Sequence, residues 1–263
     1  MKMLEFDSRN MFGTDGSGNQ KKIWIDNKYL LKVNSKLREA SKEVDACKLA
    51  ELFGLNHAKY KEIKVVVDGV EKNACITENY LGVNDSDITM WEILDRLNII
   101  WTYKMSAVEV INIAINSIVK YTDNALSQQA VTFYIYSMML FDFLICNDDR
   151  HLNNFGLIYN EETKQFRFAP LYDHGETFFR TDATLTMKEY ETKVRRFKSK
   201  PFSTNQVKNL GDLSVSKQVF LIMLKNLGSK QKIIDSDIKD GHKLTIIRQF
   251  NKLCDLFNIK DYC

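Results

Sequence analysis

Two acidic side chains and one amide stand at the ends of apolar segments, where a hydrophobic core has no use for them. Asp149 and Asn154 lie five positions apart in a polar loop that follows the apolar segment 131–145, and Asp173 ends a second, shorter apolar run. Carboxylate and amide oxygens suit Mg²⁺, a hard cation that also keeps water and phosphate oxygens among its ligands. The pattern therefore indicates a site for a magnesium-bound phosphate.

The simplest alternative for this loop is a solvated turn in which an aspartate caps a helix, as charged loop residues commonly do. The order of features along the chain argues against it. Four features follow one another: a buried segment, Asp-Arg-His-x-x-Asn from Asp149 to Asn154, a short hairpin, and Pro-Leu-Tyr-Asp ending at Asp173. Four linked features in one order are more specific than a lone motif. Asp149 and Asn154 also have the separation of the Asp and second Asn in the protein-kinase catalytic loop.

Phosphoryl transfer needs a cradle for the phosphates, a metal site and a group that positions the attacking hydroxyl. Asp149 is predicted to orient the acceptor hydroxyl and to take its proton, while Asn154 and Asp173 bind Mg²⁺. His151 and Arg150 lie in the same loop, and His151 is counted with the catalytic candidates. For both residues the sequence leaves two roles open, neutralising phosphate charge or bracing the loop.

A glycine-rich turn near the N-terminus, with Gly16, Ser17 and Gly18 at its centre, supplies a candidate phosphate cradle. Glycine lets backbone N–H groups approach phosphate oxygens without a Cβ in the way. The order of the glycines departs from the G-x-G-x-x-G of protein kinases and from the P-loop, and such a turn is also typical of an ordinary hairpin. The strands beside it are predicted at residues 22–26 and 29–33.

The second of these strands carries Lys32 inside an apolar run. This position predicts the lysine that pairs with nucleotide phosphates, and the alternative is an edge-strand lysine that faces water. A helix is predicted to begin with Ser41 as its cap and to run to Phe53. Within it, Glu43 is placed to hold Lys32, with Glu39 as the second choice. A solvated helix glutamate remains the alternative for both.

Asp68-Gly69, flanked by apolar strands at 61–67 and 72–77, is a clear hairpin signal. The second strand leaves the predicted sheet and turns near a glycine, as the hinge between two lobes would. Main-chain groups from Glu78 to Tyr80 are predicted to meet the edge of an adenine ring. The segment, rather than any one side chain, is the candidate.

The rest of the chain is predicted to be mainly helical from residue 85 onward. Residues 131–145 are apolar nearly all round, which predicts a central buried helix. The basic stretch 190–200 is either a solvated face or a docking surface for an acidic segment or a phosphoresidue. Short strands are predicted at 155–159 and 166–169, and further helices at 108–119, 218–227 and 243–257.

Composition places few limits on function but excludes some classes. The 263 residues suffice for one large domain or two modest lobes, and a net charge of +3 is too small to predict direct nucleic-acid binding. The five cysteines are scattered without a C-x-x-C pair, which favours a reducing compartment over disulfides or zinc. No secretory signal is visible, and Asp142 interrupts the most apolar segment, so no membrane span is predicted. We expect a cytoplasmic protein, with a secreted effector as the alternative.

At these residues the chain resembles the HipA-like serine/threonine kinases, the toxins of bacterial toxin–antitoxin modules. The resemblance spans residues 13–173, and its two specific motifs are Asp-Arg-His-Leu-Asn-Asn at 149–154 and Ala-Pro-Leu-Tyr-Asp at 169–173. Residues 17–21 are similar to the family's phosphate loop, Leu31-Lys32 to its nucleotide lysine and 43–54 to its first helix. The Asp-Arg-His-x-x-Asn order is also similar to that of phosphatidylinositol kinases.

The resemblance implies an α+β, bilobal kinase-like fold, with a β-rich N-lobe at 1–83 and a helical C-lobe at 84–263. It also implies ATP and Mg²⁺ as cofactors and a protein serine or threonine as acceptor, in the toxin branch typically on an aminoacyl-tRNA synthetase. The implied partner is an antitoxin, or a separate chain that supplies the small N-terminal subdomain of longer relatives. The family's regulatory serine aligns near Asp15, so autophosphorylation is a hypothesis for Ser17 or Thr14.

Two other functions fit the same motifs. A lipid or small-molecule kinase on this scaffold would transfer phosphate to a metabolite rather than to protein. A nucleotide-binding pseudokinase would act through protein interaction alone, although the joint presence of Lys32, Asp149, Asn154 and Asp173 argues against it.

Overall fold

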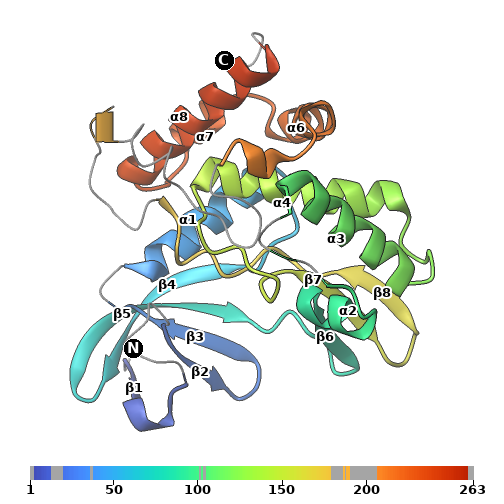
Figure 1. Ribbon diagram of the computed structural model, residues 1–263. Coiled ribbons are helices and arrows are strands. Elements are labelled where there is room, and N and C mark those ends of the chain that lie inside the picture. Colours follow the sequence, from blue (N-terminus) through green and yellow to red (C-terminus); the bar gives the residue numbers. More distant parts are fainter. Residues whose placement is uncertain are drawn as a thin grey trace.

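The structure is a computed structural model that describes residues 3–12, 20–35, 38–100, 102, 105–178, 186, 188–189 and 206–259. It combines two β-sheets with a group of packed helices, so the predicted α+β class is confirmed. The five-stranded sheet lies at one end of the molecule and most of the helices at the other, with the three-stranded sheet beside them (Figure 1). The glycine-rich turn with Gly16, Ser17 and Gly18, and the basic stretch 190–200, lie outside the described residues.

The five-stranded sheet has the order β1-β4-β5-β3-β2, in which β1 pairs with β4 in parallel and the other pairs are antiparallel. The turn between residues 25 and 29 and the predicted turn at Asp68-Gly69 have the backbone that tight hairpins require, because Asp26, Asn27, Asp68 and Gly69 all have positive φ. The strands are β1 Leu4–Phe6, β2 Lys21–Ile25, β3 Tyr29–Val33, β4 Tyr60–Val67 and β5 Val70–Glu78.

Helix α1, Glu39–Leu52, crosses the sheet and begins two residues before the predicted cap. The prediction for Ser41 is therefore wrong: this residue lies inside the helix, and its hydroxyl donates to the carbonyl of Arg38. The amide of Ala40 is satisfied instead by the side chain of Asn34, at 2.7 Å. A cap that comes from outside the helix does not leave the usual mark in the sequence. The predicted end is confirmed, since Gly54 follows the helix with φ of 66°.

The prediction that helical structure starts at residue 85 is wrong for one element. Residues Asp85–Thr89 form strand β6, which pairs with β7, Gly156–Asn160, and β7 pairs in turn with β8, Gln165–Phe168. The segment Asp-Ser-Asp-Ile-Thr has little strand propensity, and its backbone partners lie about seventy residues away along the chain. Helix α2, Met90–Arg96, follows at once and begins with a capping box of Thr89 and Glu92.

Helix α4, Gln128–Ile145, is buried along nearly its whole length, as predicted, and it packs against α3, α6 and α8. Its side chains contribute much of the main hydrophobic core. The other helices are α3 Ala107–Tyr121, α6 Leu213–Leu227, α7 Gln231–Asp235 and α8 Asp240–Phe257, with 3-10 turns at Ser8–Asn10 and Lys208–Leu210. Among the helices that the structure describes, none combines the length and apolarity needed to cross a membrane. The predicted lobe boundary after residue 83 stays a prediction.

Candidate active site

Lys32 lies at the centre of a buried charge cluster. Its Nζ donates to Glu43 Oε1 at 2.6 Å and to Asp173 Oδ1 at 2.7 Å, and the ring of Tyr60 lies 5.1 Å from it. Burial alone would lower the pKa of Lys32, but Asp173 and Glu43 outweigh burial and raise the pKa well above its usual value. Lys32 is therefore a fixed positive charge, held by the glutamate that the sequence favoured. Glu39 instead accepts from the Ser35 amide, at 3.0 Å.

Glu43 joins helix α1 to the segment that carries Asp173. Its Oε2 accepts the backbone N–H of His174 at 2.8 Å, while Oε1 accepts from Lys32. Burial raises the pKa of Glu43, although Lys32 opposes that rise. One fully buried carboxyl group thus connects β3 and α1, which are close in sequence, to the distant segment that carries Asp173.

Asp173 has the left-handed backbone conformation, with φ of 59°, which aspartate tolerates better than most residues. Its carboxyl group contacts Lys32 and lies 3.8 Å from Lys22 Nζ, and its side chain keeps 29% exposure. Burial acts to raise the pKa of Asp173, but Lys32 and then Lys22 lower it well below the usual range for an aspartate. The carboxylate is thus ionised and partly open to solvent, as a metal ligand must be.

The loop 149–154 is a compact turn closed by its own hydrogen bonds. Asn154 Nδ2 donates to the carbonyl of Asp149 at 3.0 Å, and its backbone N–H donates to the carbonyl of His151 at 2.8 Å. The amide is thereby oriented, and its Oδ1 accepts no hydrogen bond from the part of the chain that the structure describes. Asp149 and His151 are half-exposed, and Asn147 Oδ1 accepts the backbone N–H of Asp149 at 3.1 Å.

Arg150 holds this loop against the segment of Asp173. It is fully buried, and its Nε and Nη2 donate to the two carboxylate oxygens of Asp142 at 2.8 and 2.9 Å. Its Nη1 donates to the backbone carbonyls of Asn154 at 2.7 Å and Tyr172 at 3.1 Å. Burial would lower the pKa of Arg150, and Asp142 more than reverses that effect. Of the two roles left open for Arg150, this geometry supports bracing of the loop.

His174 completes the brace from the other side. Its Nε2 lies 3.0 Å from Arg150 Nη2, and its Nδ1 lies 3.9 Å from Glu43 Oε2. Burial and then the charges of Arg150 and Lys32 lower the pKa of His174 well below its usual value, so the ring is neutral. An arginine can only donate, so Nε2 is the acceptor and Nδ1 carries the proton. A continuous polar chain therefore runs from Asp142 through Arg150 and His174 to Glu43.

The predicted hinge joins the two sheets. Glu78 ends β5 and is exposed, and the next residue donates its N–H to the carbonyl of Lys28 at 2.7 Å. Tyr80 donates its hydroxyl to Asp87 at 3.2 Å and stacks on Tyr172 with 5.7 Å between the ring centroids. The tyrosine pair ties the hinge to the segment of Asp173. The adenine contacts assigned to this segment stay a prediction.

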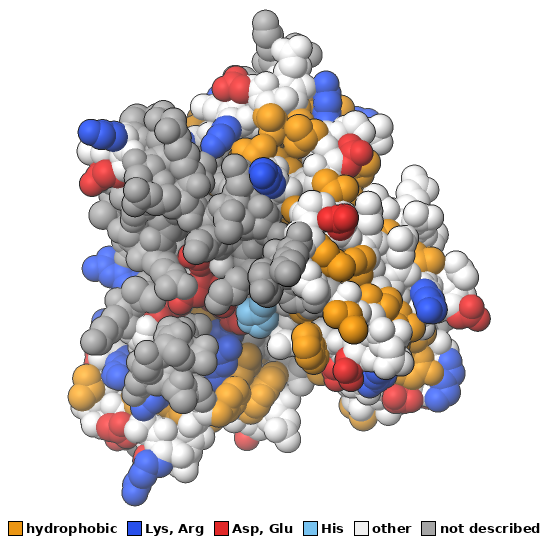
Figure 2. Space-filling model, viewed as in Figure 1, with side chains coloured by type: hydrophobic (Ala, Val, Ile, Leu, Met, Phe, Trp, Pro, Cys, Tyr) orange, Lys and Arg blue, Asp and Glu red, His pale blue; other side chains and the backbone are white. Residues whose placement is uncertain are grey.

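The structure brings Lys32, Glu43 and Asp173 into direct contact. Arg150 links the backbone carbonyl of Asn154 to that of Tyr172, the residue before Asp173. Figure 2 shows acidic side chains and a histidine gathered where the two halves of the molecule meet. Sequence reasoning missed His174 and the role of Asp142. The available signal was Asp142 itself, a single acid in an otherwise apolar helix, which requires a buried cationic partner.

The donor set fits a magnesium nucleotide better than a metal held by protein alone. Within the described ranges, no cluster of three or more His, Cys, Asp or Glu side chains could hold a metal ion. One carboxylate from Asp173 and one amide oxygen from Asn154 are the partial set that Mg²⁺ uses when phosphates and water complete its shell. The charge of Lys32 beside them favours an anionic ligand.

Comparison with known proteins identifies the family of the chain and its fold. The sequence model of the HipA-like C-terminal domain matches residues 14–230. The crystal structure of the Helicobacter pylori proinflammatory kinase CtkA is similar with a TM-score of 0.66 at 12% identity, over 97% of this chain and 94% of that chain. The Shewanella oneidensis MR-1 toxin HipA, solved with HipB and operator DNA, is similar with a TM-score of 0.52 at 13% identity, over 95% of this chain and 64% of that chain. Comparison with curated protein sequences gives no match. At such identities the similar structures show the fold alone, which is kinase-like.

Proposed function

Because the chain belongs to the family of HipA-like C-terminal domains, we propose that it is an ATP- and Mg²⁺-dependent kinase that phosphorylates serine or threonine in a protein. The observation that carries the proposal is the pair of contacts from Lys32 Nζ, to Glu43 at 2.6 Å and to Asp173 at 2.7 Å. A lysine bridged in this way is already positioned for phosphate, and phosphoryl transfer depends mainly on positioning and charge.

The residues divide the work as follows. Lys32 pairs with the α- and β-phosphates, and Glu43 fixes the direction of its side chain. Asp173 and Asn154 would hold Mg²⁺, which would supply the positive charge that offsets the charge developing on the phosphate. Asp149 orients the acceptor hydroxyl and accepts its proton. His151, half-exposed in the same loop, accepts from the Asn153 amide at 3.3 Å and is left to neutralise phosphate charge or brace the loop.

The proposal extends to the physiological context of the chain. The HipA structure contains HipB and operator DNA, which supports an antitoxin partner for this chain. A cellular target such as an aminoacyl-tRNA synthetase is what the resemblance to the toxin branch implies. CtkA, described as a proinflammatory kinase, keeps the alternative of a secreted effector open. We propose the toxin role and a cytoplasmic location, because the family model matches residues 14–230 and the two specific HipA-like motifs, at 149–154 and 169–173, are present.

The experiment is transfer of labelled γ-phosphate from ATP, with Mg²⁺ or with EDTA, to the protein itself and to proteins of a bacterial extract. Wild type should label protein only with Mg²⁺, and Asp149→Asn and Asp173→Asn should each lose at least a hundredfold in rate. Asp255→Asn, an exposed position on α8, is the matched control and should behave as wild type. Equal labelling by all four proteins would refute the proposal. Label found only in lipid or metabolite fractions would favour a small-molecule kinase, and ATP binding without turnover a pseudokinase.

A further inference from the structure

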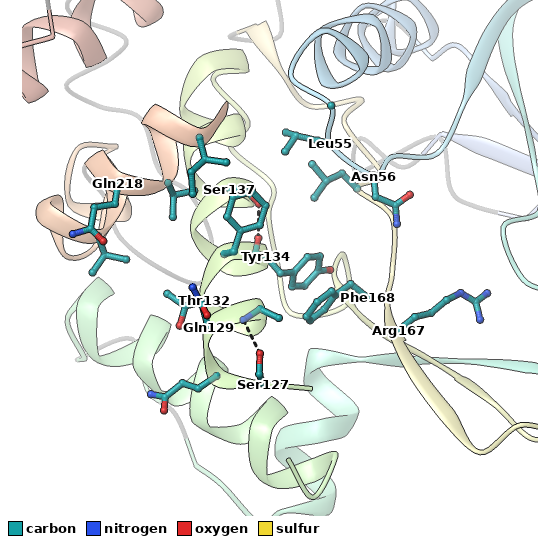
Figure 3. Close-up of a pocket in the computed structure, with 18 of the residues that line it drawn as sticks. Leu55, Asn56, Ser127, Gln129, Thr132, Tyr134, Ser137, Arg167, Phe168 and Gln218 are labelled. Carbon is teal, nitrogen blue, oxygen red and sulfur yellow. Dashed lines mark hydrogen bonds between the residues drawn. The ribbon is translucent and has the colours of Figure 1, made fainter. Parts of the chain in front are cut away.

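A cavity of about 1030 Å³ opens on the molecule outside the charge cluster. Its walls come from four places: the residues that follow α1, the first half of α4, β8 with the residues after it, and α6 (Figure 3). Its volume is at the upper end for pockets that take small organic ligands. None of Lys32, Glu43, Asp149, Asn154 and Asp173 lines it.

The inner surface of this cavity is apolar and partly aromatic. Tyr134 and Phe168 stack with 4.5 Å between centroids and an interplanar angle of 15°, and Figure 3 shows the two rings side by side. The hydroxyl of Tyr134 is engaged, since it donates to the Gly156 carbonyl at 3.3 Å. Leu171 and Val219, both buried, line the same cavity. Such a surface favours a ligand with an aromatic or branched apolar part.

The rim is polar but uncharged. The side-chain amides of Asn56, Gln129 and Gln218 lie at the opening, and in the described chain they have no hydrogen-bond partner within the protein. Each can both donate and accept. Arg167 is the lining residue that carries a charge, and it is paired with Asp85. A charged ligand would leave water without gaining a counter-charge, so the lining selects an uncharged molecule.

One wall leads directly to the proposed metal ligand. The N–H of Leu171 donates to the Asn56 carbonyl at 2.9 Å, and the Leu171 carbonyl accepts the N–H of Ala58 at 2.9 Å. The carbonyl of the next residue, Tyr172, accepts a hydrogen bond from Arg150. A molecule bound against Leu171 therefore contacts the segment that carries Asp173, at a point two residues before that aspartate. Backbone hydrogen bonds hold the segment in place there.

We propose that this cavity is a second ligand site, for an uncharged small molecule with an apolar, partly aromatic body and hydrogen-bonding groups at one end. We propose further that its occupancy changes the affinity of the protein for magnesium nucleotide through the segment 171–173. Binding itself is independent of the proposed function, whereas the coupling rests on it.

The probe for binding is N-phenyl-1-naphthylamine, an uncharged aromatic amine whose fluorescence rises in apolar surroundings. Full-length wild type should bind it saturably with one site per chain. Thr132→Trp and Gln218→Trp fill the cavity from α4 and from α6, and each should weaken binding tenfold or more. Asn116→Trp, at an exposed position of α3, is the matched control and should bind as wild type. Thermal unfolding of all four proteins separates loss of the site from loss of the fold.

Two results would overturn the binding proposal. The first is fluorescence that does not saturate, or that is the same in both cavity variants and in wild type. The second is self-association of the protein that prevents the probe from binding. In that case sedimentation runs would show that Ile222→Glu, at the exposed edge of the cavity, abolishes the self-association. That second result would make this face an interface between protein chains.

Coupling is tested by repeating the probe titration with Mg²⁺ and a non-hydrolysable ATP analogue, whose own binding is measured by calorimetry. A change of about fivefold or more in the probe dissociation constant is expected, the lower end of typical coupling between two sites. An unchanged constant with the analogue bound would refute the coupling alone. Absence of analogue binding would instead count against the proposed kinase function and leave the probe result standing.

Discussion

Asp142→Ala would remove the carboxylate that neutralises the fully buried Arg150. Among the described residues, the other hydrogen-bond partners of that guanidinium are two backbone carbonyls and the neutral ring of His174, so no second acid takes its place. Removing one member of a buried ion pair costs roughly 3–5 kcal/mol, because the other charge stays buried without compensation. For a chain of this size, each kcal/mol lowers Tm by roughly 2–4 °C, which predicts a fall of roughly 6–20 °C.

The assay is urea and thermal unfolding followed by circular dichroism, with phosphoryl transfer measured at a temperature where the variant is still folded. Activity should fall along with stability, because Arg150 also holds the carbonyls of Asn154 and Tyr172. The double variant Asp142→Leu/Arg150→Met replaces both charges by apolar groups and should recover much of the stability but not the activity. Additive losses in the double variant, or a loss under about 1 kcal/mol in the single one, would refute this reasoning.

Three further predictions concern the same cluster. Glu43→Gln keeps the shape but removes the negative charge beside Lys32, so phosphate transfer should fall at least tenfold with a raised KM for ATP; an unchanged KM would show that Glu43 does not position the lysine. The folded-state pKa of His174 is lowered below its ordinary value of 6.5, so the unfolded chain binds the extra proton. This contribution to the free energy of unfolding is complete above pH 6.5 and is lost as pH falls below it. His174→Gln should therefore make the free energy of unfolding depend less on pH below pH 6.5. The same slope of that free energy against pH in the variant and in wild type would contradict the prediction. Tyr80→Leu removes the stack on Tyr172 and the bond to Asp87, and should weaken ATP binding more than it lowers Tm, as calorimetry and melting of the same sample would show.

Features that depend on residues close together in the sequence, or on the composition of one segment, could be predicted. The Asp68-Gly69 turn was identifiable because few residues accept a positive φ at both positions. The pairing of Lys32 with Glu43 followed from a lysine in a strand and a glutamate on the next helix. The buried nature of α4 followed from its apolar composition. In each of these cases the deciding interaction involves nearby residues or one dominant property of the segment.

Features decided by distant partners could not be predicted. Strand β6 exists because β7 supplies its hydrogen bonds, and three helices, α2, α3 and α4, separate the two strands in the sequence. Nothing in the residues of β6 itself requires a strand. The start of α1 depends on Asn34, whose side chain caps it from outside the helix. The contact between Arg150 and His174 forms only where the fold buries both side chains together. No pattern in the sequence around His174 marks it as the residue that links the two loops.

The central claim is that Asp173 and Asn154, beside Lys32, hold magnesium-bound ATP. The most direct measurement is an anomalous difference map from crystals grown with Mn²⁺ and a non-hydrolysable ATP analogue, Mn²⁺ standing in for Mg²⁺. The account predicts a metal peak within coordination distance of the Asp173 carboxylate and the Asn154 amide oxygen, with a phosphate oxygen in hydrogen-bond range of Lys32 Nζ. A metal and nucleotide bound elsewhere, with Lys32 still closed on Asp173, would contradict it.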